Sequence, residues 1–188
     1  FVVIFVLISF CLRIQNLPNL SEGDLLETDA YRFFRQADLI SQHGSLPERD
    51  MMRWLPFGRD LSQQLSFSSY LIVSLHRIFR VFSDQWTLYQ TAVYYPVLCY
   101  CAAMVPLYFL IATIWNRQVA LLTLGFAAVI PSSLPRSFAG VADRDALCLF
   151  LILCMYLAYV KGIQSRRLYA ASIWICLSAV FAILLGLT

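Results

Sequence analysis

Two aspartates separated by one residue, Asp143 and Asp145, stand just before a long apolar run. Two carboxylates at the edge of hydrocarbon are costly to ionise unless a cation compensates them, and the nearest arginines are Arg136 and Arg144. The hard oxygen atoms of aspartate suit Mg²⁺ or Mn²⁺, ions that often bridge one or two carboxylates to substrate phosphates. The pair therefore indicates a divalent metal site at the start of this run.

The same aspartates have a second interpretation that needs no ligand. Acidic side chains in the first turn of a helix interact favourably with the helix dipole. Asp143 and Asp145 could serve one helix in this way, and Asp29 could serve another. Spacing alone favours this structural interpretation, because an isolated Asp-x-Asp pair is common and names no reaction.

The composition places these residues in a membrane protein. The chain has 188 residues, of which 60% are hydrophobic and 13% charged, and such a chain has too little polar surface to cover a soluble globule. The net charge of +3 is too small to indicate a nucleic acid partner. Both ends fall inside apolar runs, so we expect an excerpt of a longer transmembrane catalytic domain whose C-terminal remainder is missing.

Five apolar runs are candidate membrane spans, because a helix needs about 20 apolar residues to cross the bilayer core. The first run is cut short, and the third is the weakest because Pro131 interrupts it. The expected spans are residues 1–12, 92–115, 118–134, 144–160 and 168–188.

The basic residues of the short loops orient these spans. Arg117 follows the second span, and three basic residues within 161–167 precede the last, so the positive-inside rule places both loops on the cytoplasmic side. Residues 13–91 and 132–145 then face the other side. Asp29 and the aspartate pair are therefore expected on one, non-cytoplasmic, membrane face.

Residues 13–91 hold nine of the eleven acidic residues, which predicts a large external loop rather than a linker. Apolar residues at the helical period predict one amphipathic helix that starts at Asp29 and stops near Gly44. A second amphipathic helix is predicted over 67–82, with Ser69 on the polar side that faces away from its apolar stripe.

Two stretches resemble motifs of oligosaccharyltransferase catalytic subunits. The first-loop motif of that family has an Asp, aromatic residues at +2 and +5, and an Arg at +6, which here are Asp29, Tyr31, Phe34 and Arg35. Residues 135–145 resemble the second acidic motif, with Arg136 seven residues before the aspartate pair and a glycine between. Two motifs in the right order, separated by two predicted spans, are far more specific than either alone.

The resemblance implies an all-α, multi-span helical bundle of the GT-C glycosyltransferase type with a large first external loop that contains amphipathic helices. It implies transfer of an oligosaccharide from a polyprenyl phosphate or pyrophosphate carrier to the side-chain nitrogen of Asn in an Asn-x-Ser/Thr acceptor. Asp29 would then be a metal ligand and the carboxylate beside the acceptor amide, and Asp143 a second ligand to Mn²⁺ or Mg²⁺. Asp145 would contribute to the metal site and, with Arg136, support it.

The sequence departs from the family pattern in two respects. The middle residue of the aspartate pair is the cation Arg144, and the family's later acidic ligand and its Trp-Trp-Asp acceptor motif do not occur in these residues. We therefore expect this fragment alone to be inactive. Two alternatives stay open: another lipid-linked-sugar transferase of the same fold with a non-Asn acceptor, and a membrane transporter or non-catalytic scaffold.

Overall fold

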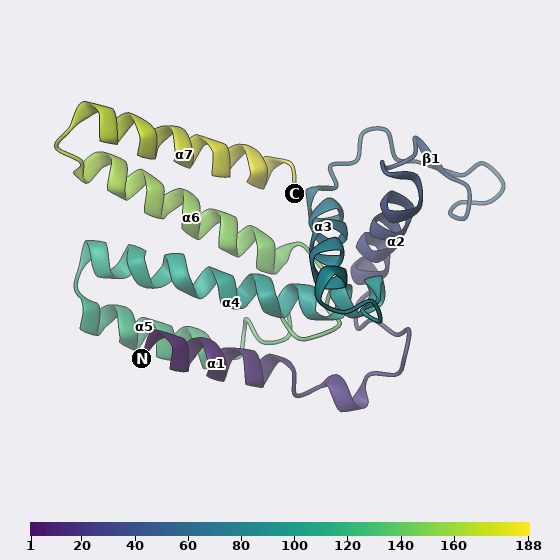
Figure 1. Cartoon of the computed structure of the whole chain (residues 1–188), viewed down its shortest axis with the longest axis horizontal. Coiled ribbons are helices and arrows are strands. Elements are labelled where there is room, and N and C mark those ends of the chain that lie inside the picture. The colour runs from purple at the N-terminus through teal and green to yellow at the C-terminus, as the bar shows by residue number, and fades with distance from the viewer.

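The computed structural model describes residues 1–188 and is built mainly of helices (Figure 1). In chain order the elements are α1 (Val2–Arg13), η1 (Leu17–Asn19), α2 (Thr28–His43), β1 (Arg49–Asp50), β2 (Arg59–Asp60), α3 (Phe67–Phe82), α4 (Leu88–Ile114), α5 (Arg117–Val129), α6 (Asp145–Gln164) and α7 (Leu168–Gly186). The strands form one short antiparallel hairpin in which Asp50 pairs with Arg59. The prediction of an all-α helical bundle is confirmed.

α1, α4, α5, α6 and α7 form a bundle in which successive helices run in opposite directions (Figure 1). α4 packs against α1, α5 and α6, and α6 also packs against α7. Four segments are long and apolar enough to cross a membrane: Val2–Asn19, Leu88–Ile114, Asp145–Gln164 and Leu168–Gly186. The fold is thus that of an integral membrane protein.

α5, the one bundle helix that is not among these four segments, is shorter than the span predicted at 118–134. It covers 13 residues and ends at Val129, a length of about 20 Å at 1.5 Å per residue. Ile130 leaves the helix with a ψ of 120° because the residue before a proline is sterically disfavoured in the helical conformation, and Pro131 follows. The chain from there to α6 forms turns instead of a further helical turn.

α4 begins at Leu88, four residues before the predicted start of its span at residue 92. Thr87 caps it, because the Gln90 N–H donates to Thr87 Oγ1 at 3.1 Å and the Thr87 N–H donates to Gln90 Oε1 at 3.0 Å. This reciprocal pair is a capping box, which satisfies two backbone donors that a helix start otherwise leaves free. The Thr-x-x-Gln spacing was readable in the sequence.

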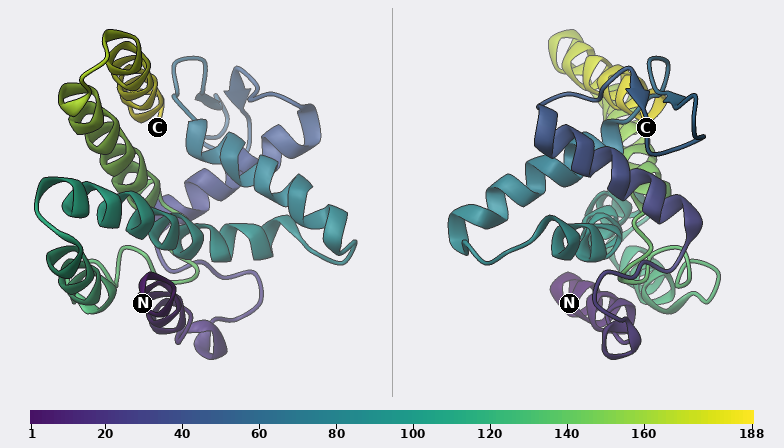
Figure 2. Two further views of the ribbon diagram at one scale, coloured as in Figure 1. Left: turned by 60° about the vertical axis from the view of Figure 1, so that its left-hand side comes forward. Right: turned by 90° about the vertical axis from the view of Figure 1, so that its right-hand side faces the viewer.

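Residues 14–87 gather at one end of the bundle, where α2 and α3 run across its long axis (Figures 1 and 2). The connection from α5 to α6 lies at this same end, and the tight turns that follow α4 and α6 lie at the other (Figure 1). The Phe67 N–H donates to the carbonyl oxygen of Leu187 at 3.2 Å, so the end of α7 touches the start of α3. We refer to this end of the bundle as the loop end.

α3 covers the predicted residues, but the buried side of the helix is not the predicted one. Ser69 is fully buried, and its hydroxyl donates to the carbonyl oxygen of Phe33 and lies 3.1 Å from Gln36 Oε1. Phe82, expected on the packed stripe, is 83% exposed. The expectation that Ser69 faces away was wrong, because hydrogen bonds to α2 compensate the cost of burying its hydroxyl group.

α2 starts one residue earlier than predicted, at Thr28, with Glu27 at the N-cap position and no side-chain cap. Asp29 lies in its first turn. The helix ends at Gly44, where a φ of 81° gives the left-handed conformation that glycine adopts without strain.

Candidate active site

The three predicted acidic residues all lie at the loop end. Asp29 is exposed in the first turn of α2, and Asp145 is the exposed first residue of α6. Asp143 precedes α6 and is only 8% exposed. Since Asp143 is not in the first turn of the helix, the helix-dipole interpretation accounts for Asp29 and Asp145 better than for the buried residue.

One glycine joins the segments that carry Asp29 and Asp143. The Gly140 N–H donates to the Val93 carbonyl oxygen of α4 at 2.9 Å, and the Gly140 carbonyl accepts from the Leu26 N–H at 3.1 Å. Gly140 has a φ of 92°, and an added Cβ would lie 3.1 Å from a methyl carbon of Leu20. Glycine is therefore required for this close approach.

The Asp143 carboxyl is buried without a cationic partner in contact. Burial raises its pKa above the ordinary value, and the negative charges of Asp145 and Asp29 raise that pKa further. The backbone N–H of Arg144 donates to Asp143 Oδ1 at 2.6 Å and acts against this rise, as does the Arg144 charge, but neither cancels it. The site therefore holds negative charge that an added cation would stabilise.

Arg136 contacts two acids of the loop end, Glu27 and Asp145. Its Nη1 lies 3.8 Å from Glu27 Oε2 and 3.6 Å from Asp145 Oδ2. The Arg136 side chain is 60% exposed, so these ion pairs are weak and screened by salt. Glu27 was not singled out from the sequence, because only the folded chain brings α2 and residue 136 together.

By themselves, no three His, Cys, Asp or Glu side chains are arranged closely enough to hold a metal ion. Asp143 and Asp29 nevertheless supply oxygen donors of the kind that Mg²⁺ and Mn²⁺ use, and the charge of Asp29 acts on Asp143. Such ions often take only one or two carboxylates from the protein and complete their coordination with water and substrate phosphates. The donor chemistry of this pair therefore fits a divalent ion.

The aromatic and basic residues of the first motif hold the loop end together. The Tyr31 hydroxyl accepts from the Leu25 N–H at 2.9 Å, and Phe34 packs edge-on against Tyr89 of α4 at 6.2 Å between ring centroids. Arg35 forms an ion pair with Asp50 of the hairpin at 3.3 Å. These contacts fix α2 and leave its exposed Asp29 free for a ligand.

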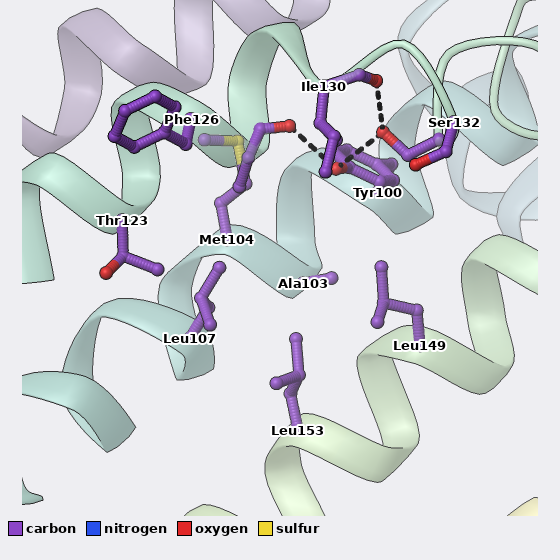
Figure 3. Close-up of a pocket in the computed structure, with 12 residues that line it drawn as sticks. Tyr100, Ala103, Met104, Leu107, Thr123, Phe126, Ile130, Ser132, Leu149 and Leu153 are labelled. Carbon is purple, nitrogen blue, oxygen red and sulfur yellow. Dashed lines mark hydrogen bonds between the residues drawn. The ribbon is translucent and has the colours of Figure 1, made fainter.

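A separate cavity of about 370 Å³ opens between α4, α5 and α6 (Figure 3). Its walls are mostly apolar, with Met104, Phe126 and Leu149 among them, and none of its lining residues is charged. The Tyr100 hydroxyl at its polar end donates to the Ala127 carbonyl oxygen at 2.8 Å and lies 3.0 Å from Ser133 Oγ (Figure 3). This cavity suits hydrocarbon and not a metal or a sugar, so it is distinct from the acidic site.

Residues 2–188, all of the chain but its first residue, match the family model for the N-terminal part of oligosaccharyl transferase STT3. The chain belongs to the STT3 family. This finding confirms the resemblance that the two motifs predicted.

Individual similar proteins agree with this membership of the STT3 family. The chain is 24% identical, over 152 residues, to the dolichyl-diphosphooligosaccharide–protein glycosyltransferase subunit STT3B of Oryza sativa subsp. japonica. This match covers 78% of the present chain and 21% of the rice protein. The fold is similar to the crystal structure of the Archaeoglobus fulgidus oligosaccharyltransferase in its apo form, with a TM-score of 0.78, 20% identity, and 99% of this chain and 23% of that one covered. The same archaeal enzyme in complex with Zn and sulfate gives a TM-score of 0.75 at 21% identity, over 99% of this chain and 24% of that one.

The chain thus spans about a fifth to a quarter of the length of these STT3 relatives. The fold of the N-terminal membrane region is shared despite low identity.

Proposed function

We propose that this chain is the part of an oligosaccharyltransferase that binds a divalent metal and positions the acceptor amide. The complete protein would transfer an oligosaccharide from a polyprenyl phosphate or pyrophosphate carrier to the side-chain nitrogen of Asn in Asn-x-Ser/Thr. The observation that carries the proposal is the buried Asp143 carboxyl, whose pKa is raised by burial and by the charges of Asp145 and Asp29. A cation is the simplest group that would compensate this charge.

The metal would be held by Asp143 and Asp29, with Asp145 contributing after it leaves Arg136. When bound, Mn²⁺ or Mg²⁺ would supply Lewis-acid stabilisation of the charge that develops on the leaving phosphate. Support for a metal in the family comes from the archaeal enzyme that was solved with Zn and sulfate. Arg136, exposed beside the acids, supplies a positive charge that attracts the phosphates of the donor.

Asp29 would also act on the acceptor. A neutral amide nitrogen is a poor nucleophile, because its lone pair is delocalised into the carbonyl group. A carboxylate that accepts both amide N–H groups favours rotation out of this conjugation, and Asp29 is exposed at the start of α2, where a peptide can reach it. The name of the rice relative, a glycosyltransferase acting on protein, supports a polypeptide acceptor.

The active face would be the non-cytoplasmic one. Arg117 starts α5, and Arg166 and Arg167 lie in the turn before α7, at the end of the bundle opposite to the acids (Figure 1). Basic residues in short loops favour the cytoplasmic side. The loop end would then meet lipid-linked donor and acceptor outside the cytoplasm.

The test uses the full-length protein in nanodiscs with a polyprenyl-pyrophosphate-linked oligosaccharide and a fluorescent acceptor peptide. We expect transfer to stop on chelation and return with Mn²⁺. Asp143→Asn should lower kcat/KM by more than about a hundredfold, the upper end of the range for groups that merely support metal ligands. Asp84→Asn, an exposed acid between α3 and α4, is the matched control and should leave the rate unchanged.

Three results would contradict the proposal. Equal Mn²⁺ dependence of wild type and Asp143→Asn would remove the metal role of this residue. Transfer to a peptide whose Asn is replaced by Gln, at the same rate, would favour the alternative glycosyltransferase with a non-Asn acceptor. Absence of transfer by the wild type with every donor tested would favour the transporter or scaffold.

A further inference from the structure

Arg13, the last residue of α1, is a buried cation with no acidic partner. Its side chain is fully buried, and the ion pairs of the structure involve only Arg35 and Arg136. An arginine stays protonated in proteins, so its charge cannot be avoided by loss of a proton. A buried charge of this kind is costly at the edge of a membrane unless every donor has a hydrogen-bond partner. Its presence therefore indicates that Arg13 has a specific role.

Neutral oxygens from three parts of the chain surround the Arg13 guanidinium. The acceptors are Ser137 Oγ at 2.8 Å from Nε, Ser9 Oγ at 2.7 Å and the Ala128 carbonyl oxygen at 3.0 Å from Nη1, and Ser133 Oγ at 3.1 Å from Nη2. The guanidinium carbon also lies 3.5 Å from the centre of the Tyr100 ring of α4. A planar group with five donors can serve such divergent partners, whereas a lysine ammonium cannot.

Most of these partners belong to the segment that leads to Asp143. Ala128 is at the end of α5, and Ser133 and Ser137 follow it before α6. The backbone of Arg13 contributes as well, because its carbonyl oxygen accepts from the Ala139 N–H at 2.9 Å. Arg13 thus holds this segment up to the residue before Gly140.

Asn16 and Tyr100 complete the support. The Asn16 amide donates to the Ala139 carbonyl oxygen at 2.6 Å, so both backbone groups of Ala139 are held from the end of α1. The Tyr100 hydroxyl lies 3.0 Å from Ser133 Oγ, which ties α4 into the same network. The chain from Pro131 to Asp143 contains no helix or strand, so its course depends on hydrogen bonds of this kind.

The geometry points to Arg13 as a positioning residue of the metal site, which sets the place of the Asp143 carboxylate by holding residues 133–139 against α1 and α4. The inference rests on the proposed function, because it assigns Arg13 to the same Asp143. Arg13 touches no substrate and no metal. Its effect is on the geometry of the carboxylate, and so on the affinity for the ion.

The test measures Mn²⁺ binding by electron paramagnetic resonance in the full-length protein without donor or peptide. Arg13→Lys keeps the charge but loses the planar fork, and Ser137→Ala removes one acceptor of that fork. We expect each to weaken Mn²⁺ binding by about tenfold, as loss of groups that orient metal ligands does. Ser178→Ala is the matched control, since Ser178 is a buried serine that bonds the Met155 carbonyl oxygen between α6 and α7.

A purely structural role predicts a different result: a lower unfolding temperature for Arg13→Lys and Ser137→Ala with Mn²⁺ affinity equal to that of Ser178→Ala. That result would overturn the inference. If Arg13→Lys does not fold, Ser137→Ala decides alone. Asp143→Asn is titrated beside them: if it binds Mn²⁺ as wild type does, the proposed function fails, and if it binds weakly while Ser137→Ala binds normally, only the role of Arg13 fails.

Discussion

The Leu26 N–H donates a hydrogen bond to the carbonyl oxygen of Gly140 at 3.1 Å, and each of these residues stands three positions before an aspartate. Leu26 leads to Asp29 at the start of α2, and Gly140 leads to Asp143 before α6. The bond therefore joins the two chain segments that carry these carboxylates. A change at this junction should alter the acidic site even though neither residue carries a reactive group.

Gly140→Ala tests the importance of this junction. The new methyl group meets Leu20 at 3.1 Å, in a backbone conformation with a φ of 92° that alanine adopts only under strain. We expect a loss of about 1 to 2 kcal/mol in stability, the usual cost of such a conformation, and a severalfold drop in Mn²⁺ affinity because the segment before Asp143 must move. Thermal unfolding and Mn²⁺ titration of the full-length protein measure the two effects.

Gly44→Ala separates the effect of backbone strain from the effect of a change close to the acidic site. Gly44 has a φ of 81° with nothing within 4 Å of an added Cβ, and it lies at the far end of α2 from Asp29. It should share the loss of stability and keep the affinity for Mn²⁺. A drop in affinity of equal size in both variants would mean that general loosening, and not the junction, controls the site.

Arg136→Gln should tighten Mn²⁺ binding. The exposed Arg136 side chain contacts Glu27 and Asp145 at 3.8 and 3.6 Å, so its removal leaves extra negative charge beside Asp143. An exposed ion pair contributes at most about 1 kcal/mol, so the gain should not exceed roughly fivefold and should vanish in high salt. Asp145→Asn should weaken Mn²⁺ binding, because it removes negative charge beside Asp143. Titration in low and high salt checks both, and weaker binding by Arg136→Gln would contradict the charge argument.

The sequence predicted those parts of the fold and site that follow from a repeating apolar pattern or a local motif. Apolar periodicity predicted α3 at its observed bounds, and the motif around Asp29 and the Asp143 pair predicted the family. The charges of the short loops predicted that these acids share one end of the bundle, and the starts of α2 and α6, which carry Asp29 and Asp145, both lie at the loop end (Figure 1). Their roles as metal ligands stay predictions.

The remaining features depend on contacts between distant residues, which a local pattern does not contain. Arg13 looked like the end of an apolar run, yet its acceptors Ser133 and Ser137 lie far along the chain. Ser69 read as polar and therefore outward, yet it meets α2. In each case a hydrogen-bond partner supplied by the fold decided the burial of a polar side chain, and residue type alone could not.

Ser69→Ala should destabilise the contact between α2 and α3. The Ser69 hydroxyl lies 3.1 Å both from the Phe33 carbonyl oxygen and from Gln36 Oε1, and all of this is buried. Loss of a buried hydrogen bond costs about 1 kcal/mol. Ser74→Ala is the control on the same helix, since Ser74 is exposed and bonds only the Tyr70 carbonyl oxygen. Equal unfolding temperatures for the two variants would show that the buried bond contributes nothing.

The ion pair between Arg35 and Asp50 anchors the hairpin and should make its stability depend on pH. Burial alone would raise the pKa of Asp50, but hydrogen bonds from the Arg35 guanidinium and from the Met52 N–H hold that pKa below its ordinary value. A lowered pKa in the folded state means that the stabilisation is complete above the unfolded value of about 3.9. It is lost as the pH falls below this value and through the folded pKa.

Asp50→Asn should therefore destabilise the hairpin by about 2 kcal/mol at pH 7, the usual worth of hydrogen bonds to a charged group. The difference from wild type should shrink as the pH falls below about 3.9, because the wild-type carboxyl is then protonated too. Hydrogen exchange of the 49–61 amides at pH 7 and thermal unfolding from pH 7 to 3 measure it. Asp60→Asn, which changes the exposed acid of β2 that bonds only Ser62, is the control. A difference between Asp50→Asn and wild type that stays constant down to pH 3 would mean that the ion pair is not what holds the hairpin to α2.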